Sequence, residues 1–143
     1  MARRVIELPS TFKFSTDYKV LYSDINAANH LGADRVLPIA MEAQMRFIKS
    51  LGYDDALVFE DAGLIMAHSE VQYISEMHYG NELEIDVTAA NFSNKSVDLI
   101  YRFTNKTKGA EAARVRASML FFDYDDKKVV AVPEGFKSKF SQR

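Results

Sequence analysis

Strand-like runs of residues fill most of the second half of the chain. Segment Glu82-Leu-Glu-Ile-Asp-Val87 alternates polar and apolar residues, which is the pattern of a strand with one buried face. Similar runs, rich in aromatic and β-branched residues, predict strands at residues 11–22, 64–77, 82–92, 97–104 and 110–124. Turn-forming residues separate the later strands, and residues 125–130 are compatible with a last short hairpin.

One long stretch, residues 34–51, has apolar residues at helical spacing. These residues are Val36, Leu37, Ala40, Ala43, Phe47, Ile48 and Leu51. Pro38 falls near the first turn, where a missing N–H costs least, and Gly52 is a natural end for the helix. One strand, one helix and an antiparallel meander together predict an α+β fold with the sheet curled around the helix.

Length and composition indicate a single soluble domain covering residues 1–143. Hydrophobic residues make up 48% of the chain and charged residues 27%, a balance typical of globular proteins. The chain has no cysteine, which excludes disulfides, cysteine-ligated zinc and a thiol nucleophile. His68 and His78 are isolated in strand-like segments, so no metal site is expected.

The distribution of charge excludes some classes of partner. The net charge is −2 with acids and bases interspersed, so we expect no nucleic-acid binding. No run approaches the ~18 consecutive apolar residues of a membrane helix. The first nine residues carry two arginines but no apolar stretch, so we expect a cytoplasmic protein without a secretory signal.

Three motifs, in order along the chain, resemble the 4-hydroxybenzoyl-CoA thioesterase family. The polar loop Tyr22-Ser-Asp-Ile-Asn-Ala-Ala-Asn-His-Leu-Gly32 resembles its aromatic–x–Asp–x–Asp–x–x–x–His–Val–Asn pattern. Segment Glu42-Ala-Gln-Met-Arg-Phe-Ile-Lys-Ser-Leu-Gly52 is similar to its Glu–x–Ala–Arg helix. The third motif, Val71-Gln-Tyr73 with Tyr79-Gly-Asn-Glu-Leu-Glu-Ile85, is similar to its Tyr-Gly-Asp-x-Leu-x-Ile hairpin. The resemblance covers residues 18–136.

The resemblance implies a hotdog fold and hydrolysis of an acyl-CoA or acyl-carrier-protein thioester without a cofactor. A hotdog sheet leaves an exposed edge and an open pocket, so we expect a homodimer, or a tetramer of such dimers. By the same resemblance, Lys95 and Ser96 stand at the turn that contacts the CoA phosphates or pantetheine. A lone lysine in a turn is also commonly just solvated.

The loop departs from the family at the residue that performs the chemistry. In many members the second acid of Asp–x–Asp attacks the thioester or activates water. Here Asp24 holds the first position and Asn26 the second, and an amide cannot act as a carboxylate nucleophile or base. Plant acyl-carrier-protein thioesterases use Asp, Asn and His in a similar stretch, of which this sequence keeps only His30.

Two catalytic arrangements remain open. In one, Asn26 polarises the thioester while Glu42, on the helix, supplies the carboxylate. In the other, His30 is the base, since histidine is suited to accept a proton from water at neutral pH. In both, backbone N–H groups around Gly32 and Ala33 at the helix start should point at the substrate carbonyl.

Structural roles compete with these catalytic ones. Asp24 is suited to accept hydrogen bonds from backbone N–H groups in its own loop. Glu42 precedes Arg46 by one turn, the spacing of a surface ion pair. Asn26 and Asn29 are residue types common in loops, and His30 could be a structural histidine beside the helix start.

The alternative functions follow from the missing acid. One is a hotdog protein that binds an acyl thioester without hydrolysing it. The other is the (R)-specific enoyl-CoA hydratase branch, whose Asp–x–Asn–Pro–x–His signature places histidine five residues after aspartate. Here His30 follows Asp24 by six residues and no proline intervenes, so this branch is ranked below the others.

Overall fold

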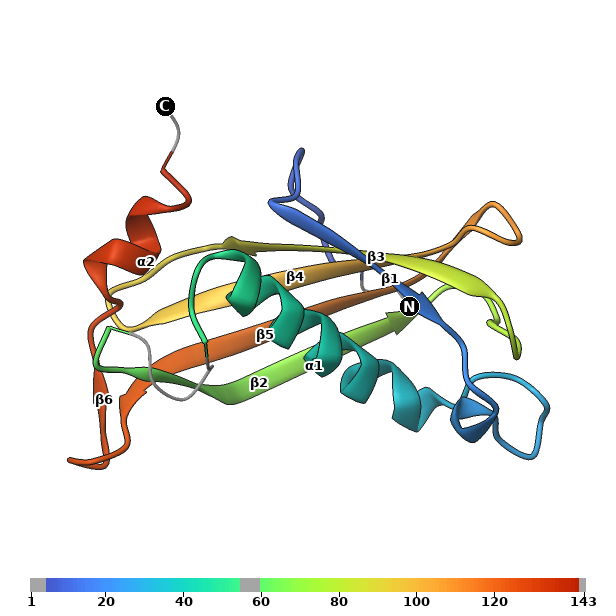
Figure 1. The fold of residues 1–143 in the computed structure, drawn as a ribbon, viewed down its shortest axis with the longest axis horizontal. Helices are drawn as coiled ribbons and strands as arrows, with labels where there is room; N and C mark the ends of the chain where they lie inside the picture. Colours follow the sequence, from blue (N-terminus) through green and yellow to red (C-terminus); the bar gives the residue numbers. More distant parts are fainter. Residues whose placement is uncertain (1–4, 55–59, 142–143) are drawn as a thin grey trace.

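The computed structural model describes residues 5–54 and 60–141 as one antiparallel sheet with a long helix across one face (Figure 1). Positions 1–4, 55–59 and 142–143, which include part of the connector after the helix, lie outside the described residues. The elements are β1 (Phe14–Lys19), η1 (Tyr22–Asp24), α1 (Ala33–Ser50), β2 (Gly63–Tyr73), β3 (Glu82–Ala90), β4 (Ser96–Asn105), β5 (Ala110–Asp123), β6 (Lys128–Val130) and α2 (Glu134–Ser138).

The strands pair antiparallel in the order β1-β3-β4-β5-β2, with β6 added to the end of β5. Strand β1 pairs with β3 at one edge of the sheet. Helix α1 then carries the chain across the sheet, so that β2 pairs with the 14-residue β5 at the opposite edge. A register shift between Met66 and His68 interrupts the pairing of β2 with β5. Irregularities of this kind bend a strand and increase its twist.

The core lies between α1 and the sheet. The helix buries the face predicted from its spacing, including Val36, Ala40, Phe47 and Ile48, none more than 1% exposed. Alternate residues of β3, β4 and β5 face this helix, and Gly52 ends it with a φ of +100°, which favours glycine. The predicted α+β architecture is therefore confirmed.

The first strand is shorter than the predicted residues 11–22. It ends at Lys19 because the backbone of Val20 pairs instead with the turn after β2, through Asn81 O and Gly80 N, each at 3.0 Å. The chain then turns into η1, where Asp24 accepts from the Leu21 N–H. This early turn brings the polar loop toward the start of α1.

Helix α2 was not predicted. It has only five residues, too few to show helical spacing, and it is held by packing of Phe136, which is fully buried. Phe136 contacts Phe92, Phe121 and Phe140 with ring centroids 5.2–6.2 Å apart. Within the described residues, no helix is long and apolar enough to span a membrane.

Candidate active site

The loop between β1 and α1 is organised around a buried carboxylate. The Asp24 side chain is 0% exposed and accepts hydrogen bonds from three donors. Tyr18 Oη donates to Oδ2 over 2.8 Å and the Leu21 N–H over 2.9 Å, while Arg35 Nε donates to Oδ1 over 3.2 Å. Asp24 therefore links β1, its own loop and α1, which is the structural role that the sequence suggested for it.

The environment of Tyr18 keeps its phenol protonated. Burial, followed by the hydrogen bond to Asp24, raises the pKa of Tyr18 to about 12. Tyr18 thus remains a neutral donor to the Asp24 carboxylate through the physiological range. With all three donors satisfied and no exposure, Asp24 is not presented to a substrate.

Asn26 lies at the start of α1. Its Oδ1 accepts from the Ala28 N–H over 2.9 Å, and its own N–H donates to His30 O over 3.0 Å. Asn29 adopts the left-handed conformation, with φ of 70°. Among the described residues, no acceptor binds Asn26 Nδ2, which lies beside the backbone of Gly32. Asn26 thus offers an amide donor at the helix N-terminus.

The backbone donors differ in availability. The Gly32 N–H is occupied, because it donates to Asp24 O over 3.0 Å. The prediction that Gly32 supplies a free N–H is therefore wrong, and the reason is this tertiary pairing. The N–H groups of Ala33 and Asp34 have no backbone acceptor in the described part of the chain, as expected in a first helical turn. Ala33 remains the candidate oxyanion donor.

Asp34 was not singled out in the sequence. Its carboxylate folds back over Gly32, so that a β-carbon at position 32 would collide with it. Negative charge in the first turn of a helix is stabilising. Gly32 therefore allows the close approach of Asp34 and Asn26 to the start of α1.

A cavity of about 270 Å³ opens between the start of α1 and the end of β2. Nine residues line it: His30, Leu31, Ala33, Val36, Tyr73, Ile74, Ser75, Glu76 and Met77. The Leu31 N–H donates to Met77 O over 2.7 Å, and Tyr73 Oη donates to Ala33 O over 3.0 Å. These two bonds fasten the helix start to the end of β2 around a mainly apolar space.

His30 is the predicted catalytic side chain that reaches this cavity. Its Nδ1 lies 3.1 Å from Leu31 O. Because a carbonyl oxygen only accepts, Nδ1 is the donor in this contact, and in a neutral imidazole Nε2 is then the nitrogen without a proton. An imidazole in this tautomer is a proton acceptor at Nε2.

Glu76 also lines the cavity and was missed from the sequence. Its Oε1 lies 3.4 Å from His78 Nε2, and Lys108 Nζ lies 2.7 Å from His78 Nδ1. Glu76 and His78 lie in the connection between β2 and β3, which do not pair with each other, and Lys108 lies in the turn between β4 and β5. No local pattern marks them, because only tertiary packing brings these two loops together.

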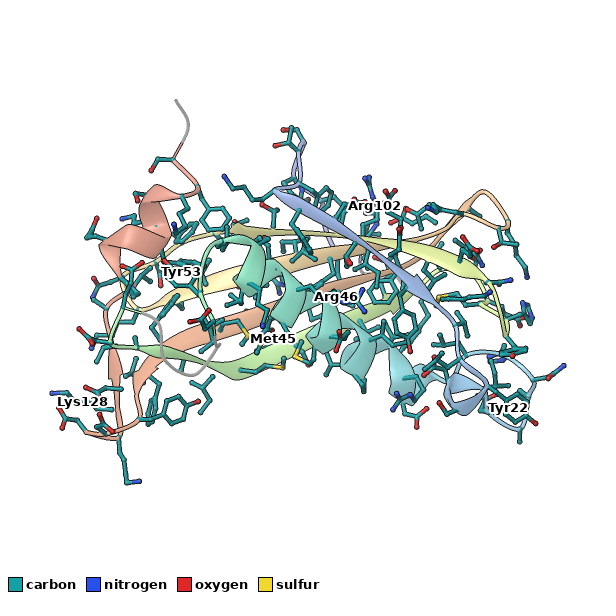
Figure 2. All side chains as sticks on the ribbon, viewed as in Figure 1. Tyr22, Met45, Arg46, Tyr53, Arg102 and Lys128 are labelled. Atoms are coloured by element: carbon teal, nitrogen blue, oxygen red, sulfur yellow. The ribbon has the colours of Figure 1, made fainter. Side chains whose placement is uncertain are left out.

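Glu42 is not brought to the cavity. It follows Ala33 by nine residues, about 2.5 helical turns, and so lies on the opposite face of α1. Its carboxylate accepts from Arg46 Nε over 2.9 Å, and Arg46 also donates to Thr16 Oγ1 and Asp17 O of β1. Figure 2 shows Arg46 on the flank of α1 that faces β1. The geometry is that of the surface ion pair.

Lys95 and Ser96 lie at the other end of the sheet. Ser96 pairs with Leu120, whereas the cavity-lining Ile74 and Ser75 donate to Ala112 O. Eight residues of β5 separate these two levels, which corresponds to about 27 Å. Within one chain, therefore, Lys95 and Ser96 do not meet His30, Asn26 or Ala33.

Comparison with protein families gives one match. The family described as the thioesterase-like superfamily matches residues 20–140, which include the polar loop, α1 and the whole of the sheet after β1. No curated protein matches the chain.

Solved structures match over most of the chain. A 1,4-dihydroxy-2-naphthoyl-CoA thioesterase from Synechocystis has 16% identity and a TM-score of 0.76, covering 87% of this chain and 93% of its own. A gentisyl-coenzyme A thioesterase has 17% identity and a TM-score of 0.79, covering 90% and 100%. A hypothetical protein from Staphylococcus aureus in complex with CoA has 19% identity and a TM-score of 0.78, covering 94% and 85%. The predicted hotdog fold is confirmed.

Proposed function

Because the chain belongs to the thioesterase-like superfamily, we propose that it hydrolyses an acyl-CoA thioester by attack of water, with His30 as the base. Family membership confirms the thioesterase class expected from the sequence. Beyond this class, we propose the kind of acyl group, the carrier and the catalytic residues from the geometry of the site.

One observation carries this proposal. His30 lines an apolar cavity at the start of α1, where the Ala33 N–H and the Asn26 amide have no internal acceptor among the described residues. A thioester whose acyl group entered the cavity would meet a proton acceptor and donors suited to its carbonyl oxygen. Donors preorganised in this way stabilise the charge that develops on the oxygen.

The proposed reaction has two steps. His30 Nε2 takes a proton from water while the water oxygen bonds to the thioester carbon, and the carbonyl oxygen becomes an oxyanion bound by Ala33 N–H and Asn26 Nδ2. The carbon–sulfur bond then breaks, the carbonyl re-forms, and the imidazolium returns its proton to the departing thiolate. The products are the free acid and the thiol.

The surroundings of the cavity support a compact acyl group. Past Val36, the core face of α1 continues with Ile39, Ala40 and Ala43, none more than 2% exposed. A long chain would have to displace these close-packed side chains. CoA as the carrier is supported by the Staphylococcus aureus structure, which was solved with CoA, and by two similar structures named as thioesterases of aromatic acyl-CoAs.

The direct test is a thiol-release screen across short, long and aromatic acyl-CoAs. We expect release of CoA from short or aromatic esters, with little from long ones. Calorimetric titration with a non-hydrolysable thioether analogue of each ester separates binding from turnover. Tight analogue binding with no thiol release from any ester would favour the second candidate, a binding protein that does not hydrolyse.

That second candidate is favoured by Asn26. Position 26 carries an amide where many members of the resembled family carry the catalytic acid, and of the two carboxylates that the sequence suggested, Asp24 is buried and Glu42 faces away from the cavity. Such a site could hold a thioester carbonyl without attacking it.

Asn26→Asp tests whether the native amide is needed. We expect the variant to fold, because Oδ1 can still accept from Ala28 N–H, and to lower kcat by about tenfold or more, because an N–H donor is replaced by a carboxylate next to Asp34. Thiol-release kinetics and thermal melting measure both effects. A faster variant would show instead that the site works best with the common family acid and that the native protein is suited to binding.

We further propose that the chain forms a homodimer, or a tetramer of dimers, through β2. This strand ends the sheet order, and Ile65 and Tyr73 within it and Ile74 directly after it are 38–53% exposed. An edge strand of 11 residues offers unpaired backbone groups to another strand. A two-fold related copy would cover the cavity and bring its own β3–β4 turn, with Lys95 and Ser96, to the cavity end. This is the arrangement in which those two residues could contact the carrier.

Assembly can be measured by sedimentation velocity at micromolar concentration. We expect dimers or tetramers for the native chain and a shift to monomer for Ile65→Glu/Ile74→Glu, because pairing would bury these charges. Lys19→Glu on the opposite edge strand, β1, is the matched control and should leave assembly unchanged. A monodisperse native monomer would contradict the proposed dimer.

A further inference from the structure

Three exposed apolar side chains form a small surface cluster at the end of the molecule that carries the start of α1. They are Leu21, Tyr22 and Tyr79, which are 52%, 77% and 65% exposed, and we call them the aromatic patch. The rings of Tyr22 and Tyr79 meet edge to face, with centroids 5.8 Å apart. Figure 2 shows Tyr22 at this extremity. Adjoining aromatic rings with this much exposure are a common feature of binding surfaces.

The aromatic patch is linked to the cavity wall through two short segments of chain. Tyr22 opens the loop that ends at the cavity-lining His30, and Tyr79 follows the cavity-lining Glu76 and Met77 by two or three residues. Three residues of extended chain span about 10 Å. The two segments are joined on the patch side, where the Gly80 N–H donates to Val20 O over 3.0 Å. These links place the rings of the aromatic patch a short distance from the cavity lining.

A cation stands beside the patch. Lys108 Nζ lies 2.7 Å from Nδ1 of His78, the residue before Tyr79. Among the described residues no carboxylate pairs with Lys108, whereas its neighbour Lys106 pairs with Asp17 at 3.4 Å. Since an ammonium has three donors, Lys108 can hold His78 and still bind an anion. The place thus combines open aromatic faces with an unneutralised positive charge.

We propose that the aromatic patch and Lys108 bind the nucleotide end of a CoA thioester whose acyl end occupies the cavity. The inference rests on the proposed function and adds how the carrier is recognised. Bases stack on exposed aromatic rings, and ammonium groups bind phosphates. The arm between the sulfur and the diphosphate has about 13 bonds and reaches roughly 16 Å when extended, enough to span from the cavity to the patch. A patch of three side chains is comparable in size to one nucleotide. It is too small for a protein interface, which buries on the order of 1,000 Å² or more.

The experiment compares ligands that share the acyl and pantetheine parts but differ in the nucleotide. Acyl-CoA and the same acyl-pantetheine are assayed with native protein, Tyr22→Ala/Tyr79→Ala and Lys108→Gln. We expect KM for acyl-CoA to rise between about fivefold and a hundredfold in the ring-less variant, with kcat unchanged. The KM for acyl-pantetheine should not change in either variant. Titration with free CoA, dephospho-CoA and pantetheine by calorimetry measures the same preference without turnover.

Two matched controls accompany these variants. Tyr22→Phe/Tyr79→Phe keeps the rings and should keep the native KM, and Lys49→Gln removes an exposed charge at the far end of α1 and should change nothing. Equal losses for acyl-CoA and acyl-pantetheine, or unchanged CoA affinity in the ring-less variant, would overturn the proposal. So would a loss confined to acyl-carrier protein, or a dependence on Lys95 in place of the patch. If no thioester is hydrolysed but the CoA titration shows the expected pattern, the proposed nucleotide site is supported and the proposed hydrolysis is contradicted.

Discussion

Replacing His30 by Gln should lower kcat for thioester hydrolysis by about a hundredfold or more, because a general base typically contributes at least that factor. Glutamine retains a donor for Leu31 O, the contact that His30 makes through Nδ1, but it has no basic nitrogen at the Nε2 position. Folding and analogue binding should therefore persist while turnover is lost. Stopped thiol-release assays at saturating acyl-CoA, together with thermal melting, measure both properties.

Glu42→Gln is the matched control for this experiment. It removes the other base that the sequence suggested, but the structure pairs Glu42 with Arg46 on the face of α1 away from the cavity. We expect an unchanged rate and a loss of less than about 1 kcal/mol in the free energy of unfolding, since exposed ion pairs contribute little. The reverse outcome, in which Glu42→Gln is slow and His30→Gln is fast, would return the catalytic role to the helix carboxylate.

Asp24→Ala should lower the free energy of unfolding by about 3–5 kcal/mol. The substitution leaves the Tyr18 hydroxyl and the Leu21 N–H without their acceptor and removes the charge opposite Arg35. Asp24→Asn keeps an oxygen for the first two donors and frees Arg35, which is 40% exposed, to enter water. It should therefore cost less, about 1–2 kcal/mol.

Urea denaturation of the three proteins tests this order. Asp34→Asn serves as the control. Asp34 is an exposed acid in the first turn of α1, and its interaction with the helix dipole should contribute no more than about 1 kcal/mol to the free energy of unfolding. If Asp24→Ala is as stable as the native protein, the carboxylate is not the link between β1, the loop and α1. If it is stable but inactive, Asp24 takes part in the chemistry rather than in folding.

The links made by Asp24 also bear on function. Its side chain draws Arg35 of α1 toward the loop, and its carbonyl oxygen accepts the Gly32 N–H. Together these bonds set how the loop meets the first turn of the helix, where Asn26, His30 and Ala33 converge. Asp24, which holds the first acid position of the resembled motif, therefore positions the groups that are proposed to bind the thioester.

Much of the fold could be predicted from residue patterns. The alternation in residues 82–87 and the helical spacing in residues 34–51 record which side of each element faces the core, and this periodicity is local. The hairpin at residues 125–130 followed from turn residues beside two valines and is confirmed by β6. Helix α2 was not predicted because five residues are too few to show helical periodicity. Its Phe136 packs against rings that are distant in the sequence, such as Phe121.

For the candidate site, the sequence by itself determined which residues are present and that they share one polar loop before a helix. Only the tertiary structure decided which of them are available. The Gly32 N–H is occupied by Asp24, Glu42 faces away from the cavity, Lys95 lies at the far end of the sheet, and Glu76 lies at the cavity wall. The periodicity of a sequence predicts which face of a single helix or strand is buried. Whether a donor or a base is free depends instead on which distant backbone and side-chain groups have already paired with it.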